Sequence, residues 1–456
     1  MPDPSPSGGA PTVMWFRRDL RLRDQPALMT AAAHGPVAAL FVLDETLLAS
    51  SGAPRTAYLF QTLRALDADL REHGGGLAVR RGRPQDVVPS LVKEIGAAAV
   101  HISADYGPYG ARRDHGVAQA LGDVPLVPTG SPYAVAPGRV LKSDGTPYKV
   151  FTPFYRAWTE HGWRRPAESD PGTVDWLVVD GDPVPHDPET AADLPGAGEA
   201  AALEAWKHFQ ANGLRWYPKN RNRPDLDQTS RMSPHLKLGT IHPRTILADL
   251  GDGHDAYRRQ ICWRDFYGQV LHHWPRSAHD YFKPEMAAMA YDSGPDADEA
   301  FATWTRGATG YPIVDAGMRQ LLAEGWMHNR VRMIVASFLV KDLHLEWTRG
   351  ARHFMDHLID GDLANNQHGW QWTAGTGTDA APYFRVFNPV NQGEKFDPDG
   401  DYVRRWVPEL RAVAGAAVHQ PWTLEDPPPD YPSPMVDHKT ERLESLSRLK
   451  ALSPPR

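Results

Sequence analysis

Side chains that could hold a large ligand gather between Gly325 and Gly375. Asp360 and Asp362 flank a glycine, and amides and two tryptophans follow them. An acidic turn can bind a hydrated cation, but no group of residues with metal-ligand spacing accompanies it. The residue types therefore predict a pocket for a large, flat ligand with a polar edge, and no metal site.

Three helices are predicted to position these groups. The first runs from about Trp326 to Leu345 and is apolar on almost every face after its opening turn, which is typical of a buried helix. The second ends at Ile359, and the third opens after the acidic turn. In the third, Asn366 and Trp370 lie one turn apart on the same face, while Trp372 points to nearly the opposite side.

A second polar stretch, YPKNRNRPDLDQTSRMSPHLKLGTIHP, begins at Tyr217. It brings hydroxyls, backbone N–H groups and a guanidinium to a predicted helix start, at Thr229, Ser230, Arg231 and Ser233. Helix N-termini and arginine both favour anions, so the pattern predicts a pyrophosphate cradle. Simple N-capping by Ser and Thr is the alternative.

A third stretch, RRQICWRDFYGQVLHHWP, carries polar and aromatic residues at helical spacing. Gln260, Trp263, Arg264 and Tyr267 fall on one helix face. An exposed tryptophan beside an arginine suits stacking on an extruded base with a phosphate contact next to it. An amphipathic core helix with ordinary aromatics is the alternative.

Short apolar strands alternate with helical patterns over residues 13–130, and the pattern is helical from Trp206 onward. The predicted strands are Val13–Phe16, Val37–Leu43, Leu77–Arg80, Ala98–Ser103 and Pro125–Val127. This rhythm predicts an α/β N-terminal domain with a doubly wound parallel sheet, followed by an all-α C-terminal domain. The absence of GxGxxG argues against an ordinary dinucleotide fold. The predicted boundaries are a lead-in at 1–11, the α/β domain at 12–135, an acidic Pro-rich linker at 136–205, the helical domain at 206–442, and a short tail at 443–456.

Composition limits the setting more than the function. The chain has 456 residues, a net charge of −7 and one cysteine, Cys262. The lone cysteine fits a reducing, cytoplasmic environment, and no apolar run is long enough to span a bilayer. The negative net charge of the whole chain does not favour binding to nucleic acid. Basic residues nevertheless outnumber acidic ones between Arg215 and Arg264, and this local positive charge could contact a phosphate backbone.

The motifs WMHNR, DGDLANN and GWQW resemble the DNA photolyase/cryptochrome family, most closely its bacterial class I cyclobutane pyrimidine dimer photolyases. The resemblance extends from Val13 to about Arg442. It implies light-driven repair of pyrimidine dimers in UV-damaged DNA, by electron transfer from reduced FAD to a flipped-out dimer. It also implies a monomer without an obligate protein partner.

The resemblance assigns roles to many positions. FAD-binding roles fall on Tyr217, Thr229, Ser230, Arg231, Met232, Ser233, Asp360, Gly361, Asp362 and Asn366. Roles at the lesion fall on Gln260, Trp263, Arg264, Asn329, Arg330, Met333 and Trp372, and DNA contacts on Arg221 and Gln392. Most relatives have Glu where this chain has Gln260; either can hydrogen-bond a pyrimidine edge, but only Glu can carry a charge.

Two further expectations concern light. In the family, residues matching Trp370 and Trp347 are the two inner members of a series of tryptophans that transfers electrons to FAD in light. The outermost tryptophan of this series has no clear match here, and Tyr291 is the nearest aromatic. A second, antenna chromophore is expected in the N-terminal domain. Folate-binding relatives carry Asn-Glu where this chain has Tyr109-Gly110, so 8-hydroxy-5-deazaflavin is favoured over methenyltetrahydrofolate.

Two alternative functions follow from the same resemblance. A cryptochrome, a flavin photoreceptor without repair activity, predicts a regulatory tail and a lesion pocket without its aromatic walls. Repair of (6-4) photoproducts relies in relatives on a histidine where this chain has Asn329.

Overall fold

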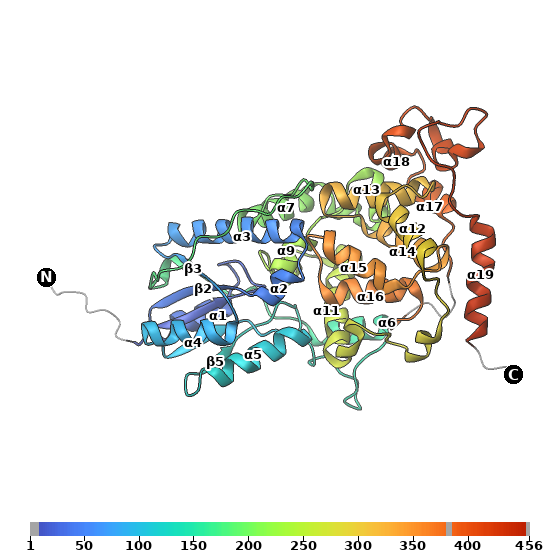
Figure 1. Ribbon diagram of the computed structural model, residues 1–456. Helices are drawn as coiled ribbons and strands as arrows, with labels where there is room; N and C mark the ends of the chain where they lie inside the picture. Colours follow the sequence, from blue (N-terminus) through green and yellow to red (C-terminus); the bar gives the residue numbers. More distant parts are fainter. Residues whose placement is uncertain (1–8, 380–384, 453–456) are drawn as a thin grey trace. The chain divides into compact units, whose positions relative to one another are not determined.

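In the computed structural model, residues 9–379 and 385–452 are described (Figure 1). They pack into two compact units. Unit 1 comprises the chain up to Thr190, Pro195–Ala211 and Ser230–Pro275. Unit 2 comprises Ala191–Leu194, Asn212–Thr229 and the chain from Arg276 onward.

Unit 1 is built on a five-stranded parallel sheet with the strand order β3-β2-β1-β4-β5. Its strands are β1 (Thr12–Phe16), β2 (Val37–Leu43), β3 (Leu77–Arg81), β4 (Ala99–Ile102) and β5 (Leu126–Pro128). Every residue of β1 and β2 is buried, as expected for strands covered on both faces. The predicted doubly wound α/β fold is confirmed.

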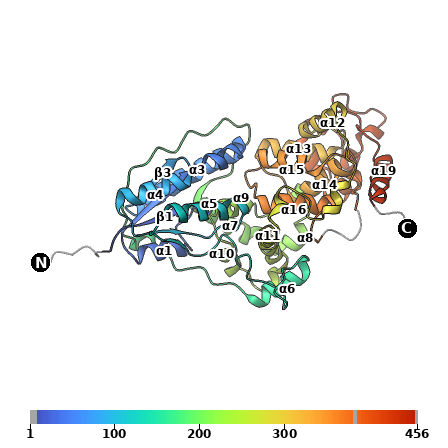
Figure 2. The same ribbon diagram turned by 60° about the horizontal axis from the view of Figure 1, so that its bottom comes forward.

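Helices cover both faces of this sheet. Connections between parallel strands are right-handed, so helices that follow β1 and β2 lie on the opposite face from those that follow β3 and β4. In Figure 1, α3 lies on one side of the strands and α4 and α5 on the other; Figure 2 also shows α4 and α5 side by side. The helices of unit 1 are α1 (Pro26–Ala32), α2 (Glu45–Ala49), α3 (Ala53–Glu72), α4 (Pro84–Ile95), α5 (Pro108–Ala120), α6 (Phe151–His161), most of α7 (Gly198–Asn212), α9 (Ser233–Leu238), α10 (Pro243–Ala248) and α11 (Asp255–His273).

Unit 2 is helical and has a core of its own. Its centre is α14, in which every residue from Ile334 to Lys341 is buried. Its helices are α8 (Tyr217–Asn220), α12 (Pro295–Arg306), α13 (Pro312–Glu324), α14 (Asn329–Lys341), α15 (Trp347–His357), α16 (Leu363–Ala374), α17 (Pro389–Phe396), α18 (Asp401–Trp406) and α19 (His438–Ala451). No helix in the two described ranges is long and apolar enough to cross a membrane.

The three predicted helices of the central stretch are present, with shifted ends. The first is shorter than predicted because the side chain of His328 caps it and accepts a hydrogen bond from the Arg330 N–H. It ends at Lys341, and His344 then adopts φ of +52°. The third begins at Leu363, as predicted.

The helical segments from residue 206 onward are shared between the units. Ser230–Pro275, which includes α11, packs with the sheet in unit 1, whereas the neighbouring segment Asn212–Thr229 packs in unit 2. Helical periodicity shows that a segment has a buried face but does not identify what covers it.

Candidate functional site

In unit 2, Arg330 lies at the start of α14 among other cations. Its Nη2 donates to Asn222 Oδ1 at 3.0 Å, and its guanidinium lies 4.4 Å from the centre of the Phe396 ring. Burial and the charges of Arg221 and Arg385 lower the pKa of Arg330 to about 10. Three guanidinium groups that repel one another at a half-buried position favour an anion beside them.

The acidic turn before α16 is held from within unit 2. Asp360 accepts both arms of the Arg332 guanidinium, at 3.2 and 2.8 Å, and its side chain is 2 % exposed. Asp362 is the N-cap of α16 and accepts from the Asn365 N–H at 3.0 Å. Arg332 was not singled out from the sequence, because no local spacing links it to Asp360.

The remaining polar groups of α14 and α16 have defined positions. Asn366 Nδ2 donates to the Ala351 carbonyl of α15 at 3.0 Å. Asn329 is exposed, and its Nδ2 lies 4.0 Å from Met333 Sδ, so these two residues share a face as predicted. Trp372 is half-buried on α16.

Buried aromatic rings line the interior of unit 2 near α16. Trp370 lies edge-on to Phe354, with ring centres 4.9 Å apart, and to Trp304 at 6.2 Å. Trp304 is a core residue, and its indole N–H donates to the Val335 carbonyl. The indole N–H groups of Trp347 and Trp370 are buried, and neither has a hydrogen-bond partner among the described residues.

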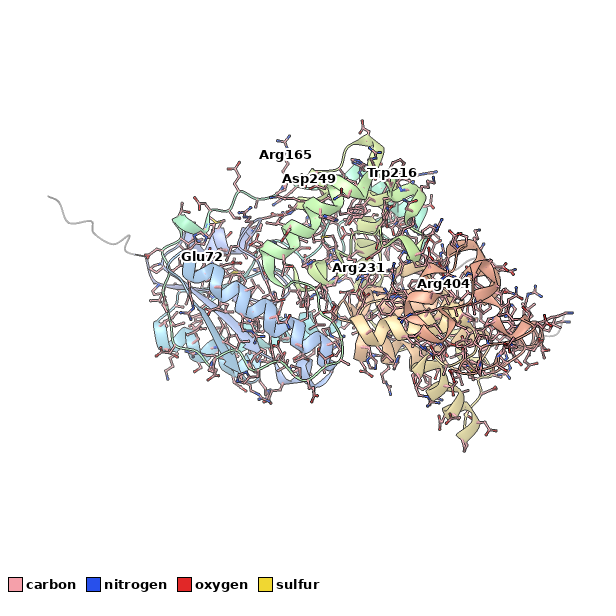
Figure 3. All side chains as sticks on the ribbon, turned by 90° about the horizontal axis from the view of Figure 1, so that it is seen from above. Glu72, Arg165, Trp216, Arg231, Asp249 and Arg404 are labelled. Carbon is pink, nitrogen blue, oxygen red and sulfur yellow. The ribbon has the colours of Figure 1, made fainter. Side chains whose placement is uncertain are left out.

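The stretch that begins at Tyr217 crosses from unit 2 into unit 1 after Thr229. In unit 2, Tyr217 is buried, which raises its pKa to about 12. The Thr229 hydroxyl is also buried, and no described residue hydrogen-bonds to it. In unit 1, the Ser230 hydroxyl accepts from the Tyr257 hydroxyl at 2.8 Å, and Arg231 adopts φ of +49° (Figure 3 labels it).

Helix α9 begins at Ser233, where a helix start was predicted. Met232 is its N-cap, and no side chain caps the helix. The alternative of simple side-chain N-capping is therefore not found at α9. The helix ends at Gly239, with φ of +72°, where a Cβ atom would lie 2.0 Å from the Arg18 carbonyl oxygen.

On α11, Trp263 presents a ring that is covered on one face. It stacks on Phe151, with ring centres 3.7 Å apart and an angle of 5° between the planes, and it remains half-buried. Gln260 is half-buried as well and bonds weakly within the helix, to the Ala256 carbonyl at 3.4 Å. Phe151 was not predicted, because it lies far from Trp263 in the sequence and no spacing connects them.

Arg264 lies next to Trp263 on α11. Its side chain is buried and donates to the Pro132 carbonyl at 2.7 Å and to the Leu236 carbonyl at 3.1 Å. It also lies over the Tyr133 ring at 4.8 Å. The guanidinium joins three segments of unit 1, and its expected contact with a phosphate stays a prediction.

The other predicted positions are compatible with ligand contacts. Gln392 is half-buried on α17, and Tyr291 is half-buried in the segment before α12. No group of three or more His, Cys, Asp or Glu side chains in the described ranges could hold a metal ion.

Comparison with known proteins places these features in a family. Residues 12–172 match the family described as "DNA photolyase", and residues 257–451 match "FAD binding domain of DNA photolyase". The chain is 44 % identical over 446 residues to a deoxyribodipyrimidine photo-lyase of Streptomyces griseus, covering 93 % of this chain and 96 % of the relative.

Three solved structures are also similar over nearly their full length. A class III photolyase of Agrobacterium tumefaciens has a TM-score of 0.90 and 35 % identity, covering 98 % of this chain and 99 % of the other. A cryptochrome of Synechocystis has a TM-score of 0.88 and 28 % identity, covering 96 % of this chain and 99 % of the other. An archaeal photolyase of Sulfolobus tokodaii with two FAD molecules has a TM-score of 0.85 and 29 % identity, covering 97 % of this chain and 100 % of the other. The chain belongs to the DNA photolyase family.

Proposed function

We propose that this protein is a deoxyribodipyrimidine photo-lyase, which uses light to split cyclobutane pyrimidine dimers in DNA. The observation that carries the proposal is near-full-length similarity to enzymes of that name, at up to 44 % identity. The half-buried Trp263, with one face stacked on Phe151, supports it because a flat ring held in this way suits stacking against an extruded base.

FAD is the cofactor, and groups in unit 2 fit it. The buried Thr229 hydroxyl has no partner among the described residues, and a phosphate oxygen would satisfy it. Because Asn366 Nδ2 donates to Ala351, its Oδ1 is oriented to accept from a ring N–H. The proposed FAD contacts are Tyr217, Thr229, Ser230, Arg231, Met232, Ser233, Asp360, Gly361, Asp362 and Asn366.

The bound FAD supplies the electron that opens the dimer, and the protein supplies position and electrostatics. Arg332 fixes the Asp360 carboxylate, and Asp362 fixes the start of α16, so both acids are held rigidly and would be available as acceptors for the cofactor. The Arg330 guanidinium, crowded by two further cations, would stabilise negative charge on the dimer.

We propose that Trp263 and Trp372 form the aromatic walls of the lesion pocket. Gln260, Asn329 and Met333 supply its polar and apolar edges. Arg221 and Gln392 contact the DNA backbone, and Arg330 lies at the lesion. The repulsion of Arg330 by Arg221 and Arg385 supports this, since a phosphate beside them would offset the positive charge and release counterions.

We propose that Trp370 and Trp347 carry electrons to the flavin, since both rings are buried in the helical core. An antenna chromophore is proposed in unit 1, with 8-hydroxy-5-deazaflavin favoured over methenyltetrahydrofolate. Strand order reverses between β1 and β4, and parallel sheets bind ligands outside the carboxyl ends of strands at such points. A cytoplasmic monomer without an obligate protein partner is the simplest form for an enzyme of chromosomal DNA.

Repair of a thymine-dimer oligonucleotide tests the function. The protein with chemically reduced flavin should restore intact thymines under blue light and not in darkness. Trp263→Ala should weaken binding to the damaged oligonucleotide by about 1–3 kcal/mol, the scale of one base–aromatic stack. Trp163→Ala is the matched control, because Trp163 is also half-buried and stacks on an aromatic ring of the same unit, Trp158 at 4.6 Å.

Bound flavin without light-dependent repair would refute the proposal. The alternative, a cryptochrome without repair activity, would then stand, in line with the similarity to the Synechocystis protein. In that case Gln260→Glu is the first variant to make, because it restores the carboxylate found in most photolyases that this chain resembles.

A further inference from the structure

Trp347 is fully buried at the first position of α15. An oxidised ring in the protein interior takes its electron back from the reduced acceptor unless a second donor, nearer to solvent, reduces the ring first. The Tyr281 ring lies edge-on to Trp347, with ring centres 5.9 Å apart and an angle of 89° between the planes. Tyr281 is half-buried, so it is nearer to solvent than the fully buried Trp347.

The Tyr281 hydroxyl is already paired with a base. It donates to Glu346 Oε1 at 2.9 Å, and Glu346 immediately precedes Trp347. Glu346 is the N-cap residue of α15, yet its side chain does not cap the helix, so the carboxylate is directed to the phenol instead. Burial, Tyr291 and Glu346 all raise the pKa of Tyr281, so the phenol is protonated at rest.

We propose that Tyr281 is the terminal electron donor of the tryptophan chain and that Glu346 takes up its proton. One electron passes from Tyr281 to the oxidised Trp347, and the phenolic proton passes along the existing hydrogen bond to the Glu346 carboxylate. The products are neutral Trp347, a neutral tyrosyl radical and a protonated Glu346. Charge and protons balance without another reactant. An external reductant later reduces the Tyr281 radical.

The proton transfer gives the step its direction. An oxidised phenol is a far stronger acid than the phenol, so a base within hydrogen-bond reach lowers the free energy of the oxidised state and favours the forward transfer. Tyr291, the aromatic predicted from the sequence, interacts with Tyr281, and both pack against Met286 and Met289. We assign it a supporting position, because among the described residues the ring in contact with Trp347 is Tyr281.

This inference rests on the proposed function, in particular on Trp347 as an electron station. Its test is transient absorption and electron paramagnetic resonance on the flavin-loaded full chain after a blue flash. The wild type should show a neutral tyrosyl radical that forms as a tryptophan radical decays, with slower formation in D₂O. Tyr281→Phe should lose the tyrosyl signal and prolong the tryptophan radical.

Two further variants make the assignment specific. Glu346→Gln keeps the shape and removes the base, so tyrosyl formation should slow several-fold. Tyr291→Phe is the matched control and should retain the tyrosyl signal. A tyrosyl signal that survives in Tyr281→Phe, one that disappears in Tyr291→Phe, or its absence from the wild type would each overturn the inference. Dimer repair by chemically reduced wild type is measured separately, so a failed proposal of function is distinguishable from a failed assignment of Tyr281.

Discussion

The packing of Trp370 depends on a glycine in the neighbouring helix. Gly350 lies on α15, and a Cβ atom at this position would be 2.2 Å from Trp370 Cη2 and 2.5 Å from Leu339 Cδ2. Real Cβ atoms do not approach other atoms so closely, so Gly350→Ala must displace the indole, the Leu339 side chain or α15 itself.

The magnitude follows from two opposing effects. Overpacking of a well-packed core costs about 1–3 kcal/mol. Alanine in a helix interior is more favourable than glycine by about 0.8–1.0 kcal/mol. Gly369→Ala on α16 isolates the second effect, because a Cβ atom there meets nothing within 4 Å. We expect Gly369→Ala to stabilise the protein and Gly350→Ala to be less stable than Gly369→Ala by about 1–3 kcal/mol.

Urea unfolding of the two flavin-loaded variants, followed by tryptophan fluorescence, measures this difference. The rate of light-driven flavin reduction is measured on the same samples. If Trp370 is a station, Gly350→Ala should alter that rate while Gly369→Ala serves as the reference. Equal stabilisation by both substitutions would refute the reasoning, because it would mean that the indole does not lie against the α15 backbone.

Three more results are expected. Trp347→Phe should abolish light-driven reduction of bound flavin, measured by the loss of its oxidised absorbance under a fixed lamp, and unchanged reduction would exclude Trp347 as a station. Arg221→Ala should weaken DNA binding equally for all sequences and lower the slope of log affinity against log salt by about 1, the value for one phosphate contact. Burial lowers the pKa of His368 to about 4, so below about pH 6.5 the unfolded chain binds a proton at this residue that the folded chain does not. The free energy of unfolding should therefore fall by about 1.4 kcal/mol by pH 5.5. This appears as a shift of the urea midpoint, and His368→Asn should remove that part of the shift.

The sheet could be predicted almost residue by residue. Strands buried on both faces read as continuous apolar runs bounded by turn residues, and β2 has the predicted limits, Val37–Leu43. Helix ends were less predictable. The start of α14 depends on a His328 side chain acting as a cap, and its end on the φ of +52° at His344, neither of which follows from apolar periodicity.

Side-chain partners across long sequence distances could not be predicted. The spacing of Trp263 and Arg264 on α11 is local, and so it was visible in the sequence. Whether each faces ligand or core is decided by Phe151 and by the Pro132 and Leu236 carbonyls, which come from other segments. The same helix face therefore carries one residue that suits a base and one that holds unit 1 together.

The choice between Tyr291 and Tyr281 has the same cause. The sequence favoured Tyr291 as the nearest aromatic, whereas in the structure a buried glutamine holds the segment that carries Tyr281. Gln371 Oε1 accepts from the Phe282 N–H at 2.8 Å, and its Nε2 donates to the Ser277 carbonyl at 3.0 Å. Gln371 directly follows Trp370 on α16 and is fully buried, so both of its polar ends need these partners. The segment that carries Tyr281 is thus hydrogen-bonded to the helix that carries Trp370. These bonds keep the proposed terminal electron donor in a fixed position relative to the buried tryptophans.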